Sequence, residues 1–67
     1  MGSVARITHI SARSEQSFDD AVRVGIERAH QTLRHVSGGW VKDMKVECEE
    51  GQITAYQVVL EVTFVLD

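Results

Sequence analysis

The residues of this sequence that could carry chemistry are few, and they suit binding better than catalysis. His9, His30 and His35 do not have the spacing of metal ligands. His30 and His35 are five positions apart, and on a helix this places them about 140° apart around the axis. No nucleophilic side chain is paired with a base in the sequence. Gln57 has an amide that both donates and accepts hydrogen bonds, and Trp40 is the sole tryptophan; neither residue type by itself indicates catalysis. We therefore expect a binding protein and not an enzyme.

Composition limits the partners of the chain. Its seven basic residues are scattered, and the net charge of −3 argues against binding to nucleic acid or to an anionic membrane surface. No apolar run approaches the roughly 18 residues of a membrane span, and no signal-peptide pattern opens the chain. Cys48 is the single cysteine, which is compatible with a reducing cytoplasm, the location that we expect.

The length predicts one domain, residues 1–67, near the lower size limit for a chain that folds alone. The usual reinforcements of small domains are missing, because the sequence has no disulfide pair and no metal-ligand cluster. Self-association is the reinforcement that remains, so we expect a homo-oligomer.

The end of the chain, residues 52–67, has the clearest pattern. Apolar side chains occupy every second position, at Tyr56, Val58, Leu60, Val62, Phe64 and Leu66. A period of two places all six on one side of a β-strand, and their β-branched and aromatic content suits a half-buried strand. This apolar side needs a cover. The opposite side, which carries Gln57, is where we expect the function to lie.

One segment can supply the cover, an amphipathic helix that begins after Ser17. The Ser17 hydroxyl is placed to accept the backbone N–H of Asp20 and so to cap the helix. Apolar side chains then recur at helical spacing, at Val22, Ile26, Ala29, Leu33 and Val36. We expect about five helical turns, ended by Gly38. Gly25 lies beside the apolar stripe and predicts close approach of a strand.

Two further strands are predicted at residues 4–11 and 40–49, and Glu50-Gly51 is a two-residue turn signal before the last strand. The element order is therefore β-α-β-β. We expect an α+β fold in which a three-stranded antiparallel sheet wraps around one amphipathic helix.

The turn predicts which side chains share the side of the sheet that carries Gln57. With a two-residue loop and unbroken pairing, Met44 faces Gln57. That side would then carry Trp40, Met44, Val46 and Cys48 beside Ile53, Ala55, Gln57 and Val59. One helix cannot cover two apolar sides, so other subunits must cover the second. A change of one residue in the loop would reverse this assignment.

Several segments resemble the dodecin family. They are Ser17-Phe18-Asp19-Asp20-Ala21-Val22, Thr32-Leu33-Arg34, Glu50-Gly51-Gln52-Ile53 and Tyr56-Gln57-Val58, in a gapless match over nearly the whole chain. The resemblance implies a hollow homododecamer that binds flavin (riboflavin, lumichrome or FMN) in pairs near two-fold axes. It also implies a store and quencher of flavin and not a turnover enzyme.

The resemblance assigns roles to particular positions. A family glutamine that hydrogen-bonds the polar edge of the flavin matches Gln57, although an exposed strand glutamine needs no function. Lys45 stands where some members place a basic side chain near the flavin phosphate, although as a surface lysine it needs no function either. Many relatives carry a second basic residue where this chain has Val65, so we expect little preference for the phosphorylated flavin.

The tryptophan that stacks on the flavin is where the sequence departs from the family. Gly38 occupies that position and Trp40 follows two residues later, on the same side of a strand. Gly38-Gly39 could permit a bulge that moves the ring back towards the site. Alternatively, Trp40 packs in a subunit contact, and the protein is a dodecin-like shell that has lost flavin binding and binds another small molecule or ion. We favour retained flavin binding with altered geometry.

Overall fold

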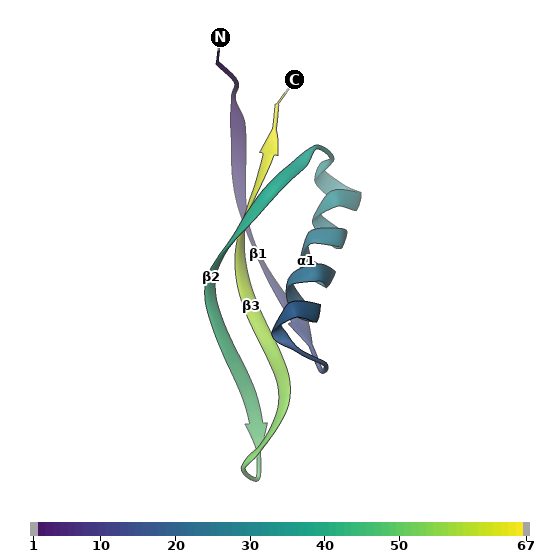
Figure 1. Cartoon of the computed structure of the whole chain (residues 1–67), viewed down its shortest axis with the longest axis vertical. Helices are drawn as coiled ribbons and strands as arrows, with labels where there is room; N and C mark the ends of the chain where they lie inside the picture. Colours follow the sequence, from purple (N-terminus) through teal and green to yellow (C-terminus); the bar gives the residue numbers. More distant parts are fainter. Residues whose placement is uncertain (1, 67) are drawn as a thin grey trace.

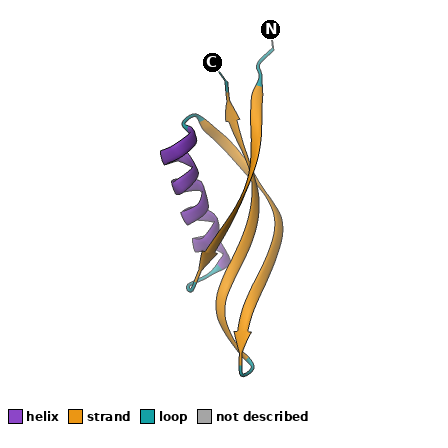
Figure 2. Cartoon of the chain, turned by 180° about the vertical axis from the view of Figure 1, so that it is seen from behind, coloured by secondary structure: helices purple, strands orange, loops and turns teal. Residues whose placement is uncertain are grey.

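The computed structural model describes residues 2–66 and has the expected β-α-β-β order. Its elements are β1 (Ala5–Ser14), α1 (Phe18–Leu33), β2 (Val36–Glu49) and β3 (Gln52–Val65). The three strands form one antiparallel sheet in the order β1-β3-β2, so β3 is central. The helix lies along one face of the sheet, and the β2–β3 turn projects beyond it (Figures 1 and 2). No helix within residues 2–66 is long and apolar enough to cross a bilayer.

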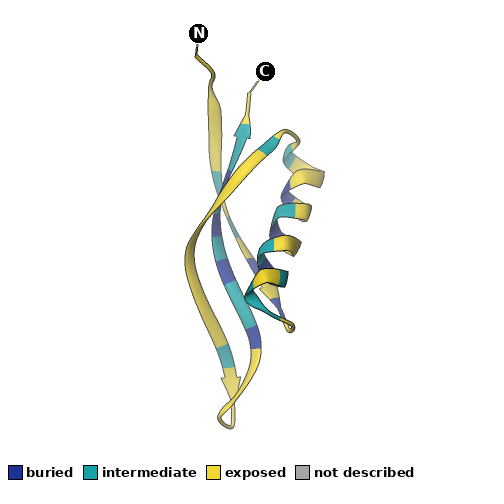
Figure 3. Ribbon diagram, viewed as in Figure 1, coloured by how far each residue is buried: buried dark blue, intermediate teal, exposed yellow. Residues whose placement is uncertain are grey.

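The core lies between α1 and the apolar row of β3. Val58, Leu60 and Val62 are fully buried there, as the alternation in the sequence predicts. Leu66, the last member of the predicted row, lies beyond the end of β3 and is 44% exposed. The ring of Tyr56 is half-buried and packs edge-on against Phe18, with ring centroids 5.1 Å apart. Figure 3 shows the buried positions on β1, β3 and α1, whereas β2 is exposed along nearly all of its length. Only the central part of the sheet is therefore covered by the helix.

Gly25 allows the helix to approach the sheet closely, as predicted. A Cβ atom at this position would lie 3.0 Å from both the Cβ atom of Ala12 and the Cδ1 atom of Leu60. These distances are shorter than ordinary van der Waals contact. The close neighbours are thus side chains of two strands, and they explain why glycine is tolerated inside a helix despite its cost.

The predicted start of the helix is correct and the predicted end is wrong. The Ser17 hydroxyl accepts the backbone N–H of Asp20 at 3.0 Å. At the other end the helix stops at Leu33, because Arg34 and His35 adopt positive φ angles of 59° and 48° and turn the chain into β2. Val36 still packs against the core, but from the first position of a strand.

Gly38 is therefore not the helix stop but a residue inside β2, which begins four residues earlier than Trp40. The first strand is also longer than predicted and continues to Ser14, whose side chain is buried. In both cases, pairing with the long central strand extends the strand into a segment whose own sequence pattern is weak.

The β2–β3 turn has the predicted two-residue form. Glu50 and Gly51 both adopt positive φ, at 53° and 78°, which suits the right-handed twist of a hairpin. Glu49 pairs with Gln52 beside this turn, as expected.

Beyond the turn, β-bulges make the pairing register of β2 and β3 differ from the predicted one. Between the pairs Cys48–Ile53 and Glu47–Ala55, β3 contains one additional residue. Lys45 therefore faces Gln57, and the predicted placement of Met44, Val46 and Cys48 beside Gln57 is wrong. Those three side chains belong to the face that carries α1. An extra residue in one strand reverses the facing of everything after it, and the sequence pattern did not reveal it.

A second bulge restores the original facing further along β2. Val41 pairs with Leu60 and Asp43 with Val59, so Lys42 is the additional residue there. Trp40 consequently faces Glu61 and lies on the same face as Gln57, as predicted.

Candidate functional site

The candidate site lies on the outer face of the sheet, which we define as the face opposite α1. Directly paired residues of neighbouring antiparallel strands share a face, so the register assigns its members. Four rows cross it, and from the turn end they are Arg13–Gln57–Lys45, Ser11–Val59–Asp43, His9–Glu61–Trp40 and Ile7–Thr63–Gly38. All four residues selected from the sequence, Gln57, Trp40, Gly38 and Lys45, are therefore on one face.

Gln57 has a fixed side chain with free hydrogen-bonding capacity. Its Nε2 atom donates to Ser11 Oγ at 2.9 Å, and this contact orients the amide across β1. One N–H of Nε2 and the Oε1 atom have no partner among residues 2–66. A groove of about 270 Å³ adjoins the amide and is lined by Asp43, Lys45, Gln57 and Val59 of the outer face, together with Met44, which lies between Asp43 and Lys45 on β2 although its register assigns it to the face of α1. The structure thus brings Gln57 and Lys45 together at one groove.

An ion pair borders Gln57 on the side of the hairpin turn. Arg13 Nε donates to Glu47 Oε2 at 3.0 Å, and the pair crosses the outer face above β3, where Ala55 is fully buried. The hydrogen bond and charge of Glu47 raise the pKa of the Arg13 guanidinium above its ordinary value. The sequence did not predict this pair, because β1 and β2 are not adjacent and the contact spans the central strand.

Trp40 is exposed over 66% of its surface and carries a lysine on its ring. The Lys42 Nζ atom lies 3.9 Å from the ring centroid, a cation–π contact. Glu61 Oε2 lies 3.8 Å from the same Nζ atom and 3.0 Å from His9 Nε2. Lys42 and Glu61 were not predicted from the sequence. The only available signal was the spacing of Trp40 and Lys42, two residues apart on one strand.

Trp40 and Gln57 do not meet within one chain. Trp40 faces Glu61, four residues along β3 from Gln57, which corresponds to about 13 Å. A side chain at position 38 would face Thr63 and lie about 20 Å away along the strand. Gly38 has open space around it and contributes no side chain to the site. The ring at Trp40 is thus one row nearer to Gln57 than a ring at position 38.

Gly39, the second glycine before Trp40, has a packing role on the opposite face. A Cβ atom on Gly39 would lie 3.0 Å from Ile26 Cδ1 of the helix. The local irregularity falls at Ser37, before the glycines, where β2 contains one extra residue. Gly39 therefore lets β2 pass under α1.

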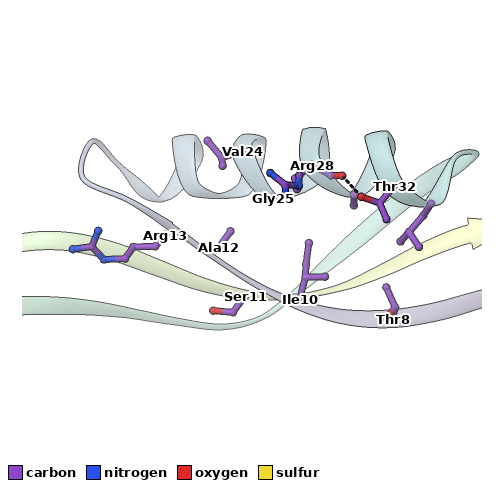
Figure 4. A pocket seen from close by; sticks show the side chains of 11 residues that line it. Thr8, Ile10, Ser11, Ala12, Arg13, Val24, Gly25, Arg28 and Thr32 are labelled. Carbon is purple, nitrogen blue, oxygen red and sulfur yellow. Dashed lines mark hydrogen bonds between the residues drawn. The ribbon is translucent and has the colours of Figure 1, made fainter.

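A larger cavity of about 460 Å³ lies between α1 and β1 (Figure 4). Its walls are largely apolar and include Ile10, Ala12 and Leu33, with Arg28 among the lining residues. The Thr32 hydroxyl in this cavity donates to the Arg28 carbonyl oxygen of its own helix at 3.3 Å. Because β1 is an edge strand, the cavity marks where the core is left uncovered.

Within residues 2–66, no group of three or more His, Cys, Asp or Glu side chains could hold a metal ion.

Comparison with known proteins agrees with this architecture. The family model described as Dodecin matches residues 4–67. A curated dodecin from Thermus thermophilus is 36% identical over 67 residues, which cover 100% of this chain and 97% of the relative. The solved structure of dodecin from Streptomyces davaonensis superposes with a TM-score of 0.93 at 36% identity, covering 100% of this chain and 98% of the other. That of dodecin from Streptomyces coelicolor gives 0.91 at 34% identity, covering 97% and 93%. The chain belongs to the dodecin family.

Proposed function

We propose that this protein sequesters flavin (riboflavin, lumichrome or FMN) in the cytoplasm, on the outer face of its sheet, as a hollow homododecamer. Sequestration means that the protein binds the ring, shields it from water and quenches its excited state, without a catalytic cycle. The observation that carries the proposal is the Gln57 amide, which is hydrogen-bonded to Ser11 and has one donor and one acceptor without a partner among residues 2–66, beside a groove. Family membership supports the same conclusion.

The hydrogen-bonding capacity of Gln57 fits the flavin. The pyrimidine edge of the isoalloxazine ring alternates acceptor and donor atoms, and a carboxamide presents one of each in the same plane. Ser11 accepts one amide hydrogen, so among residues 2–66 the second N–H and Oε1 are left for a ligand. An oriented amide loses little conformational entropy when a ligand binds.

Trp40 is the proposed stacking group, acting across a subunit boundary. Its ring is exposed and shares the outer face with Gln57, but the separation of about 13 Å along β3 prevents one small pocket from using both groups of one chain. The groove of about 270 Å³ is also smaller than a typical ligand pocket of roughly 300–1,000 Å³. A second copy that brings its own outer face against the first would supply the missing walls.

The surface of the single chain supports self-association. Large apolar side chains are exposed along the sheet, among them Ile7, Trp40, Met44 and Ile53. Both edge strands have unpaired backbone groups along one side, and the core is open next to β1. Burying these surfaces between copies would supply the stability that a chain of 67 residues has difficulty obtaining alone. Twelve copies is the number that the family implies.

Lys45 is proposed to lie near the flavin side chain. It faces Gln57 directly across the strand pair and is exposed. A single ammonium group binds phosphate less firmly than a pair of guanidinium groups, and Val65 adds no charge. Riboflavin and FMN should therefore bind with similar affinity.

A fluorescence titration tests the proposal. Riboflavin emission should fall as protein is added at micromolar concentration, and the purified protein should be yellow. Sedimentation velocity in parallel should give the mass of a large closed oligomer. Undiminished riboflavin emission together with a large oligomer would instead favour a shell that has lost flavin binding, and a well-folded monomer would contradict both.

A further inference from the structure

We propose that Lys42 is a positioning residue that covers one face of the Trp40 ring and leaves the other face for the ligand. The inference rests on the proposed function, in which Trp40 stacks on flavin. It assigns to Lys42 a role that neither the sequence pattern nor the family resemblance predicted.

The bulge in β2 explains why this lysine reaches the ring. Lys42 has no pairing partner on β3, because Val41 pairs with Leu60 and Asp43 with Val59. An extra residue of this kind bends the strand and redirects its side chain. The Lys42 Nζ atom lies 3.9 Å from the Trp40 ring centroid, well inside the range of about 6 Å for a cation–π contact.

Glu61 holds the ammonium group above the ring. It faces Trp40 directly in the strand register, and its Oε2 atom lies 3.8 Å from Lys42 Nζ. The same oxygen contacts His9 Nε2 at 3.0 Å, which anchors the carboxylate from the third strand. Only 22% of the Glu61 side chain is exposed, so its contact with Lys42 is less screened by solvent than a fully exposed pair. Side chains from all three strands, His9, Glu61 and Trp40, thus hold the Lys42 ammonium group in place.

The face of the Trp40 ring that Lys42 covers is unavailable to the aromatic ring of a ligand. Stacked aromatic carbons need a separation of about 3.5–4.0 Å, and the ammonium group already lies at that height above the indole. A ligand must therefore use the opposite face or displace Lys42. Displacement breaks both the cation–π contact and the ion pair with Glu61, so the opposite face is favoured.

Lys42 also supplies support that the surroundings of Trp40 lack. Trp40 is 66% exposed, and Gly38, its neighbour on the same face of β2, has no side chain to pack against the indole. Holding the indole in one orientation before binding reduces the entropy lost when a ligand stacks on it. We expect the contact to contribute about two- to fivefold to flavin affinity.

The sole tryptophan permits a test in the protein without flavin. In Lys42→Ala, acrylamide quenching of Trp40 emission should rise by about twofold, because both ring faces become accessible. Lys42→Arg should restore the quenching of the original protein, since a guanidinium group also stacks on indole. Arg6→Ala is the matched control, because Arg6 is an exposed cation that faces Phe64 at the far end of β1. It should leave Trp40 emission unchanged.

A second variant keeps the test decisive if Lys42→Ala does not assemble. Glu61→Gln preserves the size of the side chain but removes the charge that holds Lys42, and it should raise quenching in the same direction by a smaller factor. Unchanged quenching in both variants would overturn the inference, and so would tighter riboflavin binding by Lys42→Ala, which would make Lys42 a competitor for the stacking face. A native protein that does not quench riboflavin would overturn the proposed function, whereas the acrylamide result would still decide whether Lys42 covers the ring.

Discussion

The two faces of β3 differ in what their side chains contact. On the inner face, towards α1, Val58, Leu60 and Val62 are buried among apolar side chains of the helix and β1. On the outer face, Gln57 contacts a serine and Glu61 contacts a histidine and a lysine. Adjacent residues of β3 therefore have different surroundings, because successive side chains of a strand point to opposite faces. Apolar packing is therefore concentrated on the inner face and polar contacts on the outer face.

The edge strand β2 differs from the central strand in regularity. Two of the three bulges insert their extra residue in β2, at Ser37 and Lys42. The central strand contains the third, at Thr54 near the hairpin turn, and its apolar row from Tyr56 onward is unbroken. A strand paired on both sides must satisfy two registers at once, whereas an edge strand can bend with fewer consequences. The irregular strand is also the one that presents Trp40.

The largest expected effect is on the inner face. Leu60→Ala removes a side chain that is 1% exposed and should lower the free energy of unfolding by about 2–5 kcal/mol, because a cavity replaces packed methyl groups. Denaturant titration with circular dichroism would measure the loss. Val59→Ala, one position away on the outer face and half-buried, is the control and should cost clearly less. Equal losses would contradict the division between the two faces.

The start of the helix should matter next, since it places α1 on the inner face. Ser17→Ala removes the acceptor for the Asp20 backbone N–H and should lower stability by about 0.5–2 kcal/mol. The melting temperature would report this change. Ser37→Ala, whose exposed hydroxyl makes a single contact of 3.4 Å with the Thr63 carbonyl oxygen, should be nearly neutral. A larger loss from Ser37→Ala than from Ser17→Ala would show that the cap does not determine helix stability.

On the outer face the expected effect is on binding. Gln57→Ala should weaken riboflavin binding by about five- to tenfold, the equivalent of roughly 1–1.4 kcal/mol for one net hydrogen-bonding group. The melting temperature should change little, since Gln57 makes one side-chain hydrogen bond, to Ser11. Gln52→Ala, at the exposed start of the same strand, is the control and should bind riboflavin normally. Unaltered affinity in Gln57→Ala would remove the central support for the proposed site.

The smallest effect concerns the pH dependence of the helix start. Ser14 Oγ donates a hydrogen bond of 2.6 Å to Asp20 Oδ2, and this bond is the main reason why the pKa of Asp20 lies below its ordinary value. The hydrogen bond from Arg23 lowers the pKa further. A carboxylate with a lowered pKa in the folded state stabilises the fold above its ordinary pKa of about 3.9. That stabilisation is lost as the pH falls through the folded value.

Asp20→Asn should therefore reduce the melting temperature at neutral pH, and the difference from the native protein should shrink as the pH falls below about 4. Thermal melts across this range would measure it. Asp19→Asn is the matched control, because Asp19 is the exposed neighbour in the same helical turn. A constant difference at every pH would mean that the Asp20 charge is not the stabilising feature.

Local patterns allowed much of the fold to be predicted. The alternation of β3, the cap at Ser17 and the turn at Glu50-Gly51 each depend on residues close together in the chain, and all three are present. The helix end was missed because Arg34 and His35 adopt positive φ without being glycine. No local sequence signal distinguishes such residues from the last turn of a helix.

The candidate site could be predicted only in part. Gln57 and Trp40 were selected from the sequence, and their common face follows from the register. Lys42, Glu61 and the Arg13–Glu47 pair were missed, because each contact depends on which residues of different strands face one another. A single bulge changes those partners without changing the composition of the strand.

The sequence by itself determined the family, the order of elements and the apolar row of β3, since periodicity and turn chemistry are properties of neighbouring residues. Only the tertiary structure decided that Met44 belongs to the face of the helix, that Lys42 covers Trp40 and that Gln57 is held by Ser11. The physical reason is that bulges and cross-strand contacts arise from fitting long strands together around one helix, and the energy of that fit is shared by residues far apart in the chain.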